Sequence, residues 1–150
     1  MILIGVFCWF LSGAAFAGLG GDAASVQSDA RHFGGQVRVS RQTQYVLHEI
    51  SRDWLRVHEF ADGGGKVFAL AWRGRQHPDL QTLLNGRLAD FQLAVAQARK
   101  GQRHGQRHGG VLAATVGNLH VELGGHMGAI YGRVWFTDQL PAGMDLHEIK

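Results

Sequence analysis

The feature that most restricts the fold is an Asp-Gly-Gly-Gly run at residues 62–65, between two stretches rich in β-forming residues, 54–60 and 66–72. Glycine and aspartate accept the tight turn conformations that join antiparallel strands, so the run predicts a β-hairpin. Pairing Phe60 with Gly65 leaves a four-residue loop and gathers apolar side chains on one face, whereas a slip by one residue places charged side chains opposite apolar ones. The predicted cross-strand pairs are Glu59–Lys66, Val57–Phe68 and Leu55–Leu70.

Other parts of the chain also carry strand patterns. Apolar and polar residues alternate at 36–39, and residues 44–50 are rich in β-forming residues. Gly124 and Gly125 predict a two-residue turn of a second hairpin. The strands of that hairpin are predicted at 118–123 and 126–136.

One stretch has the spacing of a long amphipathic helix. Apolar residues recur every three or four positions from Leu80 to Ala98, Pro78 and Asp79 suit a helix start, and Gly101 suits its end. A short helical turn is expected around residues 23–32. We therefore predict an α+β fold: an antiparallel sheet of roughly five strands, with two or more hairpins, and one long amphipathic helix packed on one face.

The two faces of this sheet differ in their predicted chemistry. A three-residue turn at 51–53 places His48 opposite Arg56, with His58 diagonal to it. One face is then apolar and available to the helix: Leu47, Leu55, Val57, Phe68, Leu70 and Trp72. The other is amphipathic, with large polar and aromatic side chains standing over Ala69 and Ala71: His48, Trp54, Arg56, His58 and Phe60.

The amphipathic face is the candidate binding site. Aromatic rings stack on sugar rings, and arginine and histidine bind anions through charge-assisted hydrogen bonds. The alternative interpretation is a solvated face, or one covered by another segment. His126, beside Gly124 and Gly125, is a further candidate, because backbone amides next to an imidazole can hold an oxyanion.

No motif predicts catalysis, a metal or a cofactor. Three His-Glu dipeptides occur, at residues 48, 58 and 147, but none extends to the H-E-x-x-H pattern of zinc proteases. The G-x-S-x-G pattern of serine hydrolases is also missing. A hydrolase that depends on a sheet-face histidine cluster, with or without a metal, is the alternative function that we retain.

The N-terminal seventeen residues have the layout of a secretory signal peptide, with an apolar stretch and an Ala-Phe-Ala cleavage site at 15–17. Cleavage would leave one small exported domain, residues 18–150, periplasmic or secreted, with no membrane span; a retained anchor is the alternative. The only cysteine, Cys8, lies in this segment, so the mature chain forms neither a disulfide nor a thiolate metal site.

Charge and low complexity add two further expectations. The formal net charge is +3, without a cluster of Lys and Arg interleaved with aromatic residues, so nucleic acid is not an expected partner.

Residues 101–110 contain the repeat GQRH-GQRH followed by two glycines, which predicts an exposed low-complexity loop.

Several blocks together carry a resemblance. The blocks are Leu-Gly-Gly-Asp-Ala-Ala-Ser at 19–25, Tyr45 with His-Glu-Ile at 48–50, Val-Phe-Ala-Leu-Ala-Trp-Arg-Gly at 67–74, Pro-Asp-Leu at 78–80 with Leu83 and Leu84, Gly-Gly-His-Met at 124–127, Gly132 with Arg133, and Leu-Pro-Ala-Gly at 140–143. In this order they resemble the bacterial exported family called domain of unknown function 2844. The resemblance implies a stand-alone exported domain and assigns no activity, ligand or catalytic residue. We therefore expect a non-enzymatic module that binds a cell-envelope component or a protein.

Overall fold

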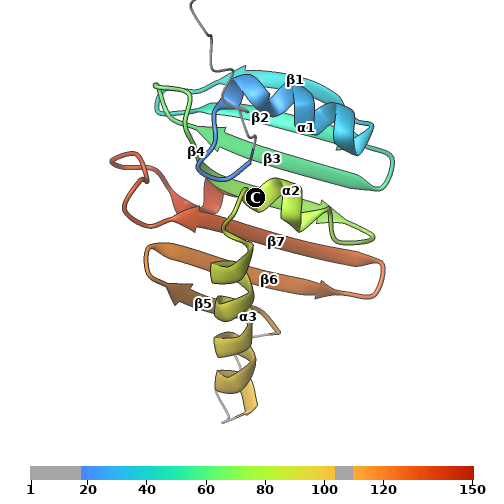
Figure 1. Cartoon of the computed structure of the whole chain (residues 1–150), viewed down its shortest axis with the longest axis vertical. Helices are drawn as coiled ribbons and strands as arrows, with labels where there is room; N and C mark the ends of the chain where they lie inside the picture. Colours follow the sequence, from blue (N-terminus) through green and yellow to red (C-terminus); the bar gives the residue numbers. More distant parts are fainter. Residues whose placement is uncertain (1–17, 104–109) are drawn as a thin grey trace, which may run out of the picture.

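The computed structural model describes residues 18–103 and 110–150, so the predicted signal peptide and most of the GQRH repeat lie outside the described residues. Seven antiparallel strands form one sheet in the order β1-β2-β3-β4-β7-β6-β5 (Figure 1). The predicted α+β class with an antiparallel sheet is confirmed, but the sheet has seven strands rather than about five. The strands are β1 (Gln36–Arg41), β2 (Val46–Arg52), β3 (Leu55–Ala61), β4 (Val67–Gly74), β5 (Leu112–Val116), β6 (Leu119–His126) and β7 (Ala129–Phe136).

The predicted long helix is two helices, α2 (Leu80–Leu84) and α3 (Leu88–Arg103). Asp79 caps α2 as predicted, because its carboxylate accepts hydrogen bonds from the amides of Gln81 and Thr82. The prediction of one continuous helix is wrong because Asn85 adopts φ 41°, a left-handed conformation that ends an α-helix. Among the described residues, no helix is both long enough and apolar enough to cross a membrane.

A third helix lies near the N-terminus, where a helical turn was predicted. The 3₁₀ helix η1 (Ala23–Ser25) leads into α1 (Val26–Phe33). All three α-helices cover the same face of the sheet, which we call the inner face (Figure 1). The main core fills the space between them, with buried residues from the sheet and from each helix: Val26, Ala30, Phe33, Ile50, Val57, Leu70, Trp72, Leu83, Leu84, Phe91 and Ala94, among others.

The register of β2 and β3 differs from the prediction by three residues. The turn is formed by two residues, Asp53 and Trp54, and Arg52 pairs with Leu55. His48 therefore lies opposite Glu59 rather than Arg56. Because an odd shift exchanges the faces of a strand, the predicted grouping of His48 with His58 on one face is wrong.

The register of β3 and β4 differs from the prediction by four residues. Because this shift is even, most side chains of the two strands lie on the predicted face. Glu59 lies opposite Leu70, not Lys66, and a β-bulge at Phe60 and Ala61 shifts the pairing. Because of this bulge Phe68 joins Phe60 on the opposite, outer face, where the prediction placed it on the helix side.

The second hairpin turns later than predicted. Gly124 and Gly125 are strand residues, paired with Tyr131 and Ile130, and the turn falls at Met127 and Gly128. A side chain on Gly124 would overlap the Tyr131 ring, so this glycine serves close packing rather than the turn. β5, an edge strand, was not predicted.

A second, smaller core lies on the outer face. Residues 141–150, which we call the tail, end in the short helix η2 (Leu146–Glu148) and place the fully buried Ile149 against Phe60, Phe68 and Trp135. Leu47, predicted for the helix side, also packs here. The tail therefore covers part of the face that was predicted to be free.

Candidate functional site

Side chains of alternate residues form three parallel rows across the outer face, because antiparallel pairs lie directly opposite one another. The first row is polar and contains Ser51, Arg56, Arg73, Tyr131 and Gly124. The middle row alternates in charge and contains Arg38, Glu49, His58, Ala71, Arg133 and Glu122. The third row is mainly apolar and is partly covered by the tail: Leu47, Phe60, Ala69, Trp135, His120 and Thr115.

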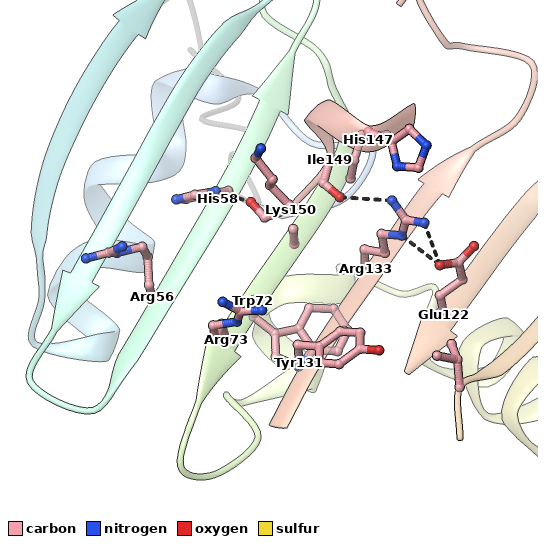
Figure 2. Close-up of a pocket in the computed structure, with 13 residues that line it drawn as sticks. Arg56, His58, Trp72, Arg73, Glu122, Tyr131, Arg133, His147, Ile149 and Lys150 are labelled. Carbon is pink, nitrogen blue, oxygen red and sulfur yellow. Dashed lines mark hydrogen bonds and ion pairs between the residues drawn. The ribbon is translucent and has the colours of Figure 1, made fainter. Parts of the chain in front are cut away.

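A pocket of about 580 Å³ lies where the tail crosses the first two rows (Figure 2). Its lining comes from β3, β4, β6, β7, Val111 and the tail. This volume is in the range of small-molecule binding sites. The titratable residues of the lining are Arg56, His58, Arg73, Glu122, Arg133, His147 and Lys150, besides Tyr131.

The pocket carries an excess of positive charge. Three arginine side chains and one lysine side chain line it, against one acidic side chain, that of Glu122. One Glu122 oxygen accepts hydrogen bonds from Arg133 at 2.7 Å, and the other lies 3.3 Å from His120 Nε2. Both carboxylate oxygens of Glu122 are thus already engaged, and the remaining cations dominate the field of the pocket.

Arg133 attaches the tail to the sheet. Besides its ion pair with Glu122, its Nη1 donates hydrogen bonds to the backbone carbonyls of Leu146 at 2.8 Å and Ile149 at 3.2 Å (Figure 2). Its guanidinium carbon also lies 5.3 Å from the centre of the Trp135 ring. The Arg133 side chain is therefore held in a fixed position in the lining of the pocket.

His58 makes a second attachment of the tail. Its Nδ1 hydrogen-bonds to the Lys150 carbonyl oxygen, and its Nε2 lies 3.0 Å from a carboxylate oxygen of Glu49. Both ring nitrogens of His58 face oxygen atoms that can accept hydrogen bonds. Burial alone would raise the pKa of Glu49, but hydrogen bonds from Ser51 and His58 and the charges of Arg56 and His58 lower it overall.

Arg56 and Arg73 are the arginines of the pocket that remain available. The Arg56 side chain is 63% exposed and makes one long ion pair, 3.8 Å, with Glu49. Arg73 is exposed, and its side chain forms neither an ion pair nor a hydrogen bond with residues 18–103 or 110–150. Next to Arg73 in the same row is Tyr131, whose ring packs against the backbone of Gly124.

The structure brings two of the six predicted site residues together, Arg56 and His58. His48 is buried on the inner face, and Phe60 is buried beneath the tail. Trp54 packs against the main core, with the Arg52 guanidinium 5.6 Å from its ring centre. The predicted binding face of five side chains is therefore not formed.

His126 lies at the tip of the second hairpin, apart from the pocket. It is exposed, and its Nδ1 lies 3.0 Å from the Met127 carbonyl oxygen, to which it donates. The structure places it with none of the other predicted site residues.

Sequence reasoning missed Arg73, Tyr131, Arg133 and the tail as parts of the site. Arg73 and Arg133 were each visible as charged residues inside apolar strands, a pattern that marks a face exposed to solvent or to a ligand. Pairing β4 with β7 places them near Arg56 and His58, and the strand order needed for this comes from the tertiary structure.

The retained hydrolase alternative relied on convergent histidines. His48 and His58 lie on opposite faces of the sheet, so the predicted cluster is not formed. Within residues 18–103 and 110–150, no group of three or more His, Cys, Asp or Glu side chains is placed to hold a metal ion.

Comparison with known proteins identifies a family. The model of the family described as "Protein of unknown function (DUF2844)" matches residues 15–149, which include every strand and helix described above. Neither the curated proteins nor the solved structures gave a match.

Proposed function

The chain belongs to the DUF2844 family, and we propose that it is a non-enzymatic binding module that holds an anionic group of a cell-envelope component in the outer-face pocket. The observation that carries this proposal is the Arg73 guanidinium, exposed beside Arg56 and without a partner among the described residues. A carboxylate or phosphate placed between two guanidinium groups relieves their repulsion and accepts hydrogen bonds from both.

The other walls of the pocket favour a ligand with an apolar face as well as a charge. The Tyr131 ring lines the pocket and is held in place by its packing on Gly124. A sugar ring presents C–H groups that pack on an aromatic ring. Together these features favour an acidic polysaccharide, or a phosphorylated one, over a neutral sugar.

The proposal places the protein in the periplasm or outside the cell, as residues 1–17 predict. Anionic saccharides and phosphate esters are accessible to an exported protein in that location. The fixed positions of Arg133 and His58 keep the pocket preorganised, which lowers the entropic cost of binding.

The test is a titration of the protein, isolated as the chain from residue 18, followed by ¹H–¹⁵N NMR. Three probes are compared: inorganic phosphate, a galacturonic acid oligomer and a neutral maltose oligomer of the same length. We expect shifts of the amides and side chains around Arg56, Arg73 and Tyr131 with the acidic probes, and none with the neutral oligomer. Phosphate acting alone would indicate a phosphorylated ligand, and the uronic acid oligomer acting alone an acidic polysaccharide.

The matched variants are Arg73→Gln in the pocket and Arg38→Gln on β1, which lies on the same face outside the pocket lining. A hydrogen bond to a charged group contributes about 1.5–3 kcal/mol, so Arg73→Gln should weaken binding roughly tenfold or more. Arg38→Gln should leave binding unchanged. Equal binding by wild type and Arg73→Gln, or shifts confined to other surfaces, would contradict the proposal.

A further inference from the structure

Two carboxylic acids are buried between α1 and the sheet, on the inner face and away from the pocket. Asp29 of α1 is 4% exposed and Glu59 of β3 is 0% exposed. Asp29 lies on the same helical stripe as Val26, Ala30 and Phe33, and so points toward the core. Glu59 lies in a cross-strand row that is otherwise apolar apart from His48.

The two carboxyl groups lie within hydrogen-bonding reach of each other. Asp29 Oδ2 and both carboxylate oxygens of Glu59 are buried without a hydrogen-bond donor among the described residues. Ionised carboxylates only accept hydrogen bonds, so this contact becomes a hydrogen bond only when one of the two carries a proton. Two unprotonated carboxylates in this position would repel each other in a medium that screens them poorly.

The neighbouring charged groups do not neutralise the pair. On α1, the charge of His32 lowers the pKa of Asp29 less than burial raises it, and the Nε2 of His32 lies 3.0 Å from a carboxylate oxygen of Asp79. On β2, His48 lies opposite Glu59, and burial and the charge of Arg41 lower its pKa, which favours the neutral imidazole. On β4, the residue opposite Glu59 is Leu70.

We propose that Asp29 and Glu59 share one proton that fastens α1 to the sheet, and that loss of this proton under alkaline conditions releases α1 as a hinged helix. The raised pKa of both groups agrees with this arrangement; burial is the largest cause for each, and the second carboxyl adds to it for Glu59. Because folding raises both pKa values, the support for docking of α1 is complete below the ordinary values of 3.8 and 4.5 and is lost progressively as the pH rises through about 6 for Asp29 and about 8 for Glu59.

The segments on both sides of α1 allow it to move while the rest of the fold persists. Before α1, Gly20 and Ala23 donate backbone hydrogen bonds to the carbonyls of Val67 and Gly65. After α1, the chain continues directly into β1, which pairs with β2. Release of α1 would expose the apolar stripe that includes Val26 and Phe33, and with it a pH-dependent interaction surface.

The test is amide hydrogen–deuterium exchange of the chain from residue 18, at about pH 6 and about pH 9, corrected for the intrinsic pH dependence of exchange. One pKa unit corresponds to a tenfold change in equilibrium, so we expect protection of the α1 amides to fall at least tenfold while β3 and β4 remain protected. In Glu59→Gln the amide donates a hydrogen bond to ionised Asp29 without a shared proton. Its α1 protection should therefore be independent of pH.

Asp29→Asn provides the same donor from the helix side and should behave alike, which keeps the test valid if Glu59→Gln does not fold. Asp53→Asn, an exposed carboxyl in the β2–β3 turn, is the matched control and should follow the wild type. The proposal is overturned if α1 protection in the wild type does not depend on pH. It is also overturned if wild type and the foldable variant lose protection equally.

Discussion

Arg56 on β3 and Arg73 on β4 occupy directly opposite positions on the outer face of the sheet. Like charges at opposite positions destabilise an antiparallel pair. The chain therefore keeps a repulsive contact at the edge of its pocket, as many binding sites do at a cost in stability.

Removal of this repulsion should stabilise the fold. Arg73→Thr is expected to raise the free energy of unfolding by roughly 0.2–1 kcal/mol at low salt, with the gain disappearing at high salt, because salt screens exposed charges. Urea denaturation at two salt concentrations measures this. Arg38→Thr is the control: Arg38 lies opposite Glu49, so its loss should destabilise slightly. A stability gain for both variants would point to strand propensity instead of charge.

Arg133 should be required for docking of the tail. Arg133→Gln removes an ion pair and hydrogen bonds to the carbonyls of Leu146 and Ile149, and we expect a loss of about 1.5–3 kcal/mol. Limited proteolysis should cut the tail of this variant faster than in the wild type. Arg75→Gln, in an exposed loop, should leave both measurements unchanged.

The side chain of Ile149 should contribute most of the apolar energy of the tail. Ile149 is fully buried over the second core, and truncation of such a side chain to alanine costs about 2–5 kcal/mol. Leu146, in the short helix η2 directly before Ile149, is 40% exposed, so Leu146→Ala should cost far less. Urea denaturation and binding of a hydrophobic dye compare the two variants. Equal losses would mean that the tail does not pack as described.

Asn85 should tolerate glycine better than alanine. Its φ of 41° lies in the left-handed region, which costs an alanine side chain about 1–2 kcal/mol and a glycine nothing. Thermal denaturation of Asn85→Ala should therefore show a loss of about 1 kcal/mol, with Asn85→Gly close to the wild type. If both variants are as stable as the wild type, the break between α2 and α3 does not depend on this residue.

His48 should make the protein less stable in acid. Its pKa is lowered by burial and by the charge of Arg41, against a backbone hydrogen bond with Glu59. The unfolded chain therefore binds a proton before the folded chain does, and the free energy of unfolding falls as the pH drops below about 6.5. In His48→Gln the free energy of unfolding, measured by urea denaturation, should decrease less between about pH 7 and about pH 5 than in the wild type. An equal decrease in the variant and the wild type would mean that other groups, such as Glu49, cause the loss of stability in acid.

Much of the local structure could be predicted from the sequence. The cap at Asp79, the helical turn around residues 23–32 and the strands near 36–39, 44–50, 54–60 and 66–72 all occur, because each depends on neighbouring residues. The blocks that resemble DUF2844 also span the chain, and the family model matches residues 15–149. These features can be predicted without knowing what each segment packs against.

The registers and the site depended on the tertiary structure. Residues 67–72 of β4 are all buried, because helices cover one face and the tail helps to cover the other, so alternation could not show which face is which. The alternation of residues could not show the position of the β2–β3 turn either. Trp54 in this turn packs against the main core, whereas the prediction placed it on a free face of the sheet.

The sequence by itself determined the fold class, the main helical and strand segments and the family, through short-range spacing of apolar, turn and capping residues. Only the tertiary structure decided which residues share a face, because register depends on what covers each side of the sheet. It brought Arg56, Arg73 and Arg133 together from three strands, closed the pocket with the tail and placed Asp29 against Glu59. Such contacts join residues far apart in the chain, and local patterns carry no information about them.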